Sequence, residues 1–197
     1  LATTIKDEPY RYASGQPVNN WDNKYIGSAR VRYAIEHSMN VCAVRTLTET
    51  VGLEKGYKYL ENFGFTTLVN NDPNYPGMSD IAQATALGGI TRGVYNIEMT
   101  AAYAAIANSG IYTEPLLYTE ILDHDGNVLI DNSKPITRRV LKESTAFLLT
   151  SAMQDVINRG TGTPARLNNM PAAGKTGTTE NSTDLWLSAY TPYYTCS

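Results

Sequence analysis

The chain has 197 residues, of which 42% are hydrophobic and 18% are charged, a composition typical of one globular domain and unlike that of a disordered chain. Its formal net charge is −3, from 16 Lys and Arg against 19 Asp and Glu, and without a basic block this argues against a nucleic-acid-binding protein. No apolar run reaches the roughly 18 to 20 residues that cross a bilayer, so we expect no membrane segment in this chain.

The two cysteines and two histidines are too widely spaced to indicate a metal site. Cys42 and Cys196 lie far apart without a CxxC pattern, and the histidines are His37 and His124. A zinc or redox site needs several such ligands at short, regular spacings. We therefore expect neither a metal nor a cofactor, and we interpret Cys42, which lies among valines and alanine, as a small core residue.

The first half of the chain reads as an irregular start followed by helices. The segment through Asn23 is rich in Tyr, Pro, Asn and Gly, which predicts irregular surface chain. Ser28 is then a candidate N-cap for a helix that ends near His37, and a second helix is expected from about Val41 to Gly52. The tripeptide Ser38-Met39-Asn40 therefore lies at the joint between two helices.

Three more helices are expected before residue 111. The first runs from Leu53 to a stop at Gly64, and a polar loop follows at 70–77. Ser79 is a candidate cap for a helix that ends at 88–89, where two glycines stand. A further helix runs from Asn96 to about 107, with its apolar face formed by Met99, Ala102, Tyr103 and Ile106.

The second half predicts a hairpin, a long helix and two strands. Asp125-Gly126 is a hairpin turn signal inside the segment 118–130. The segment 141–157 has helical spacing, and its expected core face is Leu148, Leu149, Met153, Val156 and Ile157. A turn at 161–164 and strands at 172–178 and 185–195 follow, the second bent near Pro192. Helices followed by antiparallel strands predict an α+β fold.

The run Gly-Lys-Thr-Gly-Thr-Thr at 174–179 has two possible interpretations. A phosphate-binding P-loop requires a glycine where Asn169 stands, and it requires a helix directly after the lysine, so nucleotide binding is disfavoured. The alternative is a strand whose exposed edge receives a peptide with a free carboxylate. Lys175 would then supply a positive charge, Thr176 and Thr178 would supply hydroxyls, and Gly177 would allow close approach of the substrate backbone.

The tripeptide Ser38-Met39-Asn40 supports the peptide-binding interpretation. Taken alone, Ser38 or Asn40 is better explained as a cap of the following helix. Together with the lysine run, however, it forms two of the three motifs, Ser-x-x-Lys, Ser-x-Asn and Lys-Thr-Gly, that mark penicillin-binding proteins and class A β-lactamases.

On these motifs the chain resembles the transpeptidase domain of class A penicillin-binding proteins, the bifunctional peptidoglycan synthases. The resemblance runs nearly end to end, through an ordered series of short matches at 25–27, 38–41, 86–89, 93–94, 107–110, 160–163, 174–179, 184–186 and 190–192. It implies the penicillin-binding protein/β-lactamase-like α+β fold, with a helical subdomain and part of an antiparallel sheet.

One departure stands against these matches, because no Ser-x-x-Lys occurs in the 197 residues. The nearest string, at Thr3 to Lys6, has threonine in place of serine. In the family, that motif supplies the serine that is acylated. We therefore expect residues 1–197 to be a partial transpeptidase domain that lacks the Ser-x-x-Lys segment and the final strand and helix, and that is inactive by itself.

The resemblance implies a role for each matched site residue. Ser38 would relay a proton between the absent serine–lysine pair and the leaving group, and Asn40 would bind the amide of the stem peptide or of a β-lactam side chain. Lys175 would keep the cleft positive. The hydroxyls of Thr176 and Thr178 would take the terminal carboxylate, with Gly177 between them, and the backbone N–H of Thr178 would be one oxyanion-hole donor.

The implied parent is a serine-type D-Ala-D-Ala transpeptidase on the extracytoplasmic face of the bacterial cell membrane. Its partners would be peptidoglycan stem peptides and β-lactam antibiotics. Two alternatives remain open: a nucleophile-less peptidoglycan-binding scaffold of the same fold, and a class A β-lactamase, although we find no convincing deacylation glutamate. Unpaired sheet edges would also favour dimerisation or strand exchange. The glycosylation-like tripeptide at 181–183 is interpreted as coincidence.

Overall fold

The computed structural model describes residues 2–179 and 183–197. Its N-terminal part contains short strands where irregular chain was expected. Strand β1 (Thr4–Asp7) pairs antiparallel with β4 (Gly27–Arg30), and β2 (Tyr10–Arg11) pairs with β3 (Pro17–Val18). The prediction was wrong because strands of two to four residues are too short to show an alternating pattern, and β1 finds its partner 20 residues away.

The joint between the first two helices is confirmed. Helix α1 (Val31–Glu36) is followed by α2 (Asn40–Arg45), which continues into a π-helical segment, η1 (Thr46–Val51). Ser28 does not cap α1, because it is paired within β4 and Arg30 stands at the N-cap without a side-chain hydrogen bond. Ser38 lies between the helices with a positive φ of 54°, a conformation that breaks the helix there.

The next three helical segments are confirmed, with one corrected start. Helix α3 (Leu53–Asn62), the 3₁₀ segment η2 (Gln83–Leu87) and α4 (Asn96–Ala107) occur in that order. Ser79 does not cap η2. Its hydroxyl instead accepts a hydrogen bond from the Ile81 N–H at 3.2 Å, and the helical turn begins only after Ala82.

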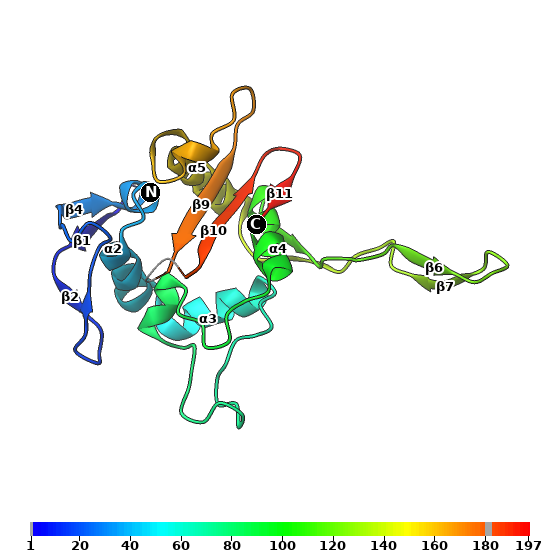
Figure 1. The fold of residues 1–197 in the computed structure, drawn as a ribbon, viewed down its shortest axis with the longest axis horizontal. Coiled ribbons are helices and arrows are strands. Elements are labelled where there is room, and N and C mark those ends of the chain that lie inside the picture. The colour runs from blue at the N-terminus through cyan, green and yellow to red at the C-terminus, as the bar shows by residue number, and fades with distance from the viewer. Residues whose placement is uncertain (1, 180–182) are drawn as a thin grey trace.

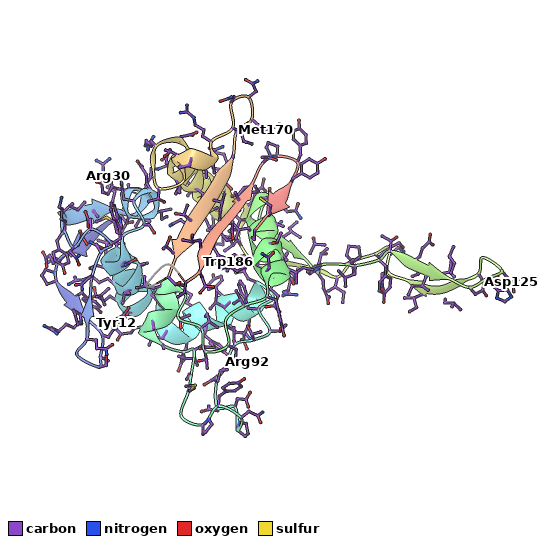
Figure 2. The ribbon with its side chains drawn as sticks, in the orientation of Figure 1. Tyr12, Arg30, Arg92, Asp125, Met170 and Trp186 are labelled. Atoms are coloured by element: carbon purple, nitrogen blue, oxygen red, sulfur yellow. The ribbon has the colours of Figure 1, made fainter. Side chains whose placement is uncertain are left out.

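The predicted hairpin is confirmed and forms an arm that projects from the body (Figure 1). Strand β6 (Glu120–Leu122) pairs with β7 (Val128–Asp131), and Asp125 lies at the tip (Figure 2). The arm extends from the pair formed by β5 (Ile111–Thr113) and β8 (Thr137–Arg139). All seven residues of β6 and β7 are exposed.

The main sheet has the strand order β11-β10-β9 and packs against two helices. Strand β9 (Ala173–Thr178) pairs antiparallel with β10 (Leu185–Tyr190), and β11 (Thr195–Cys196) follows after a bend at the predicted position. Helix α5 (Glu143–Arg159) packs on β9, and α4 packs on β10 (Figure 1). Residues 180–182 of the connection between β9 and β10, which include two positions of the glycosylation-like tripeptide, lie outside the described residues.

The principal core lies where α4 and α5 meet this sheet. It contains Ile106, Ala146, Met153, Ala173 and Tyr190. The predicted core face of α5 is confirmed at Met153, Val156 and Ile157, but Leu148 is wrong, since it is 46% exposed. Only one face of α5 packs in the core, and helical spacing alone overestimated the width of that face. The arrangement of helices and antiparallel strands confirms the α+β fold.

The segment after α5 packs tightly against the end of α1, at a glycine. A Cβ added at Gly160 would lie 2.3 Å from the carbonyl oxygen of Glu36. The turn continues through the 3₁₀ segment η3 (Thr163–Ala165). Ion pairs reinforce this contact, because Arg159 reaches the buried Glu36 at 3.1 Å and Asp155 at 2.7 Å. Backbone close approach therefore places the residues after α5 beside the joint that carries Ser38.

We predict that Gly160→Ala destabilises the protein by about 2–4 kcal/mol, because the new methyl group meets backbone that cannot move aside. The matched control is Gly56→Ala in α3, where the new Cβ would meet only the tip of the Leu47 side chain. There, improved helix propensity of up to about 1 kcal/mol offsets the repacking of Leu47. Urea unfolding measures both variants, and equal losses of unfolding free energy would contradict this account.

Candidate active site

The six site residues predicted from the sequence line one cleft of about 630 Å³. They come from three elements: the joint before α2, the first turn of α2, and strand β9. The residues are Ser38, Asn40, Lys175, Thr176, Gly177 and Thr178. Segments separated by more than 130 positions in sequence therefore meet at one site.

Lys175 connects the two walls of this cleft. It lies inside β9, paired with Ser188 of β10, and its Nζ donates to the Ser38 Oγ at 2.7 Å and to the Thr176 carbonyl oxygen at 2.9 Å. The P-loop interpretation is excluded by this placement, because a P-loop lysine opens a helix and this one stands in the middle of a strand. The lysine instead bridges a strand and a helix joint.

Burial alters the charge of Lys175. Removal of water from around the ammonium group lowers its pKa from 10.5 to about 8. Burial disfavours the charged form of a lysine, yet at pH 7 the group remains mainly protonated and can donate to Ser38. The site therefore holds a cation that gives up its proton far more easily than an exposed lysine does.

The Ser38 hydroxyl is presented by a strained turn. With φ at 54°, Ser38 leaves the path of α1, while its N–H still donates to the Ile35 carbonyl oxygen at 3.2 Å and the next N–H donates to Ala34 at 2.9 Å. A non-glycine residue in this region costs free energy and is kept where the surroundings impose it. The strain at Ser38 is consistent with a functional position.

Asn40 is oriented by the chain rather than acting as a cap. Met39 occupies the N-cap of α2 without a side-chain hydrogen bond, so the interpretation of Ser38 or Asn40 as that cap is wrong. The Asn40 Nδ2 donates to the Asn19 carbonyl oxygen at 2.9 Å. Among the hydrogen bonds of the described residues, none occupies Asn40 Oδ1, which leaves an acceptor at a position that lines the cleft.

Strand β9 provides an open edge beside these groups. Within the described residues, β9 pairs only with β10, so its other edge has no strand partner. Thr178 and Gly177 are exposed at its end. Such an edge has free backbone donors and acceptors and can bind an extended peptide by strand addition.

Thr161 is a site residue that sequence reasoning missed. Its hydroxyl lies 2.8 Å from that of Thr176, and its N–H donates to the Glu36 carbonyl oxygen at 3.3 Å. It thus links α1 to β9 beside the bond between Ser38 and Lys175. The signal was present in the Gly-Thr-Gly-Thr run at 160–163, where Gly160 permits the close approach to α1, but from the sequence that run was assigned to a turn and a family match, and Thr161 was given no role.

The rest of the cleft is largely apolar. Its lining includes Ile5, Val31, Ala34, Ile35, Cys42, Leu47, Val51, Ala86, Leu87 and Tyr103. Cys42 is buried as predicted, and burial, together with the Asp7 carboxylate, raises the pKa of its thiol to about 11. At neutral pH this thiol is not a thiolate nucleophile. No helix in the described part of the chain is long and apolar enough to cross a membrane.

Solved structures share this fold. The structure of PonA1 from Mycobacterium tuberculosis in complex with penicillin V superposes with a TM-score of 0.81 at 23% identity, over 99% of this chain and 53% of that one. Penicillin-binding protein 1A from Haemophilus influenzae gives a TM-score of 0.78 at 24% identity, over 96% of this chain and 33% of that one. The fold is that of penicillin-binding protein transpeptidase domains.

Sequence comparison gives the family. Residues 1–194 match the penicillin binding protein transpeptidase domain. Penicillin-binding protein 1A of Clostridium acetobutylicum is 37% identical over 205 residues, covering 99% of this chain and 24% of that protein, and that of Streptococcus pneumoniae is 37% identical over 187 residues, covering 93% and 24%. The chain belongs to the penicillin-binding protein transpeptidase family, and it spans about a quarter of the length of these curated relatives.

We predict that buried Lys175 makes stability depend on pH. Between pH 8 and 10.5 the unfolded chain keeps the lysine proton that the folded chain has lost, so the unfolding free energy rises with pH across this window. Relative to Lys175→Met, the unfolding free energy of the wild type should rise by about 3 kcal/mol, since a shift of one pKa unit corresponds to roughly 1.4 kcal/mol. Urea unfolding at several pH values measures the difference, and a constant difference would show that the ammonium group is hydrated.

Proposed function

We propose that this chain forms the substrate-binding and proton-relay part of a D,D-transpeptidase, which cross-links peptidoglycan stem peptides through a serine ester. The observation that carries the proposal is the 2.7 Å hydrogen bond from Lys175 Nζ to Ser38 Oγ, inside a cleft that all six predicted residues line. Family membership supplies the class of reaction. The penicillin V complex of PonA1 supports β-lactams as ligands of the same fold.

The acylated serine belongs to a Ser-x-x-Lys segment outside these 197 residues, which contain no such motif. We propose that this segment packs on the apolar part of the cleft, where Ile5, Leu47 and Tyr103 offer hydrophobic surface. Its serine oxygen attacks the carbonyl carbon of the D-Ala-D-Ala bond. The bond from that carbon to nitrogen breaks, an ester forms on the serine, and the terminal D-Ala leaves with the proton it receives.

Ser38 and Lys175 supply that proton transfer. Because the Lys175 ammonium donates to Ser38 Oγ, the Ser38 hydroxyl hydrogen is free to point toward the nitrogen of the leaving group. Ser38 gives its proton to that nitrogen and regains one from the Ser-x-x-Lys pair. A lysine with a pKa of about 8 stabilises negative charge on Ser38 during this exchange.

The remaining residues bind the substrate. Asn40 Oδ1 accepts from a backbone amide of the stem peptide, and the open edge of β9 pairs with the peptide backbone. The hydroxyls of Thr176 and Thr178 take the terminal carboxylate, and Thr161 orients the hydroxyl of Thr176. The Thr178 N–H serves as one oxyanion-hole donor. Gly177 keeps the strand edge free of a side chain that would block the peptide.

The second half-reaction reverses the first. An amine of a neighbouring stem peptide attacks the ester carbon, the bond from that carbon to the serine oxygen breaks, and the serine recovers its proton while a new amide forms. β-Lactams imitate only the first step, because the opened ring stays attached. The proposal places this domain on the extracytoplasmic face of the bacterial cell membrane, where its substrate is assembled.

The deciding experiment is intact-protein mass spectrometry after incubation with benzylpenicillin. We expect an adduct on a chain extended upstream to include a Ser-x-x-Lys segment, and none on the 197-residue chain. Lys175→Ala in the extended chain should reduce the acylation rate by at least about 10²-fold. An adduct on the short chain would make one of its own hydroxyls the nucleophile. No adduct on either chain would favour the peptidoglycan-binding scaffold.

We also propose that the chain self-associates through open strand edges. The β6–β7 arm is a two-stranded sheet with exposed apolar side chains, including Leu129 at 65% exposure and Val128 at 55%. Isolated hairpins are marginally stable in water and open edges recruit strands. Light scattering after size-exclusion chromatography should show a dimer that Leu129→Lys dissociates. A strictly monomeric wild-type chain would contradict this proposal.

A further inference from the structure

The N-terminal segment holds the Ser38–Asn40 turn through two buried polar side chains outside the cleft. Asp7, at the end of β1, has no exposed surface, and Asn20 is 4% exposed. Buried polar groups are costly unless their hydrogen bonds are made. Both groups satisfy this requirement in a single network that ends on α2.

The network uses the whole Asn20 amide. Its Nδ2 donates to Asp7 Oδ1 and to the Lys24 carbonyl oxygen, each at 2.8 Å, and its Oδ1 accepts from the Val41 N–H at 3.2 Å. The second Asp7 oxygen accepts from the Ile26 N–H at 2.8 Å. Each polar atom of the two side chains therefore has a partner.

The bond to Val41 replaces a missing helix cap. The first N–H groups of a helix have no partner within the helix, and a side chain at the N-cap usually supplies one. Met39 cannot do so, and no side-chain cap bond is made from that position. Asn20, 21 residues earlier in the chain, provides the acceptor instead. It binds the N–H of Val41, the residue directly after Asn40 in the first turn of α2.

Asp7 determines which way the Asn20 amide faces. A carboxylate only accepts hydrogen bonds, so the NH₂ group of Asn20 must face Asp7, and its oxygen must then face Val41. The neighbouring Asn19 carbonyl oxygen holds Asn40 Nδ2 at 2.9 Å. Asn19 and Asn20 thus act together: the Asn20 side chain caps the start of α2, and the Asn19 carbonyl oxygen orients the Asn40 amide.

We propose that Asn20, oriented by Asp7, is a positioning residue that caps α2 from outside and keeps Ser38 and Asn40 in register with Lys175. This inference rests on the proposed function for its catalytic meaning, but its physical content concerns only the 197-residue chain. The inner contact, from Lys175 to Ser38, and the outer contact, from Asn20 to Val41, hold the same turn from opposite sides.

The test exchanges the two side chains. In Asn20→Asp, a second carboxylate faces Asp7, so the two groups repel each other and the two oxygens that face one another have no donor between them. In the double variant Asp7→Asn/Asn20→Asp, the new amide at position 7 donates to the new carboxylate at position 20, which still accepts from Val41. Only the Lys24 carbonyl oxygen loses its donor. The single variant should therefore disturb the turn, and the double variant should restore it.

The readout is the pKa of Lys175, which is measured from the pH dependence of its ¹³Cε NMR signal. That signal is assigned as the one that disappears in the Lys175→Arg variant. In the wild type the midpoint is expected near pH 8. Loosening of the Ser38 turn admits water to the ammonium group, so Asn20→Asp should raise the midpoint by about one unit or more toward 10.5. The double variant should return it to within a few tenths of the wild-type value.

The control for simple destabilisation is Val18→Ala. Val18 is 2% exposed and packs with Val41 and Val44, so its truncation weakens the same region without removing a hydrogen-bonding group of the network. It should lower the melting temperature and leave the midpoint of Lys175 unchanged. An Asn20→Asp variant that is less stable but keeps the wild-type midpoint would overturn the proposal. Failure of the double variant to restore the midpoint would overturn the role of Asp7.

These outcomes are independent of the proposed transpeptidase activity, because the titration needs neither a nucleophile nor a substrate. If benzylpenicillin acylates neither chain while the exchange restores the Lys175 midpoint, the positioning network is correct and the proposed function fails. If benzylpenicillin acylates the extended chain but neither Asn20→Asp nor the double variant changes the Lys175 midpoint, the proposed function is correct and the positioning network fails.

Discussion

The contact between the Lys175 ammonium and the Ser38 hydroxyl is the constraint on which the site depends. It joins a strand near the C-terminal end of the chain to a helix joint near its beginning, and neither element can shift without breaking it. The contact is costly, because the ammonium loses water and its pKa falls to about 8. Such a charge persists only where the surrounding packing prevents the two walls from separating.

That packing comes from α5 and its ion pairs. Arg32 of α1 and Arg159 at the end of α5 both contact Asp155, and Arg159 also reaches Glu36. These bonds fasten α1 along α5, while α5 packs directly on β9. The close approach at Gly160 then places the following turn against α1. The distance between the two walls of the cleft is therefore set by a helix that contributes no proposed catalytic residue.

Much of this arrangement followed from the sequence, because its long helices have strong periodic patterns and its turns contain diagnostic residues. The joint at Ser38 and the strand at Lys175 were predicted because helix ends and glycine-containing strands leave local signals. Asn20 and Thr161 were not found, since their roles depend on partners 21 and 15 positions away. The short strands at the N-terminus were missed because two to four residues are too few to show an alternating pattern.

The site therefore has an inner and an outer layer with different requirements. The inner residues face the cleft, and under the proposed function they keep groups available for a ligand, as Asn40 does with its Oδ1. The outer residues can use every polar atom, as Asn20 does, because nothing but the protein contacts them. The Asn40 amide is held by the carbonyl oxygen of Asn19, the residue before Asn20. The Asp7 carboxylate, which lies outside the cleft, therefore sets the direction of the Asn20 amide, directly beside the residue whose carbonyl oxygen orients Asn40.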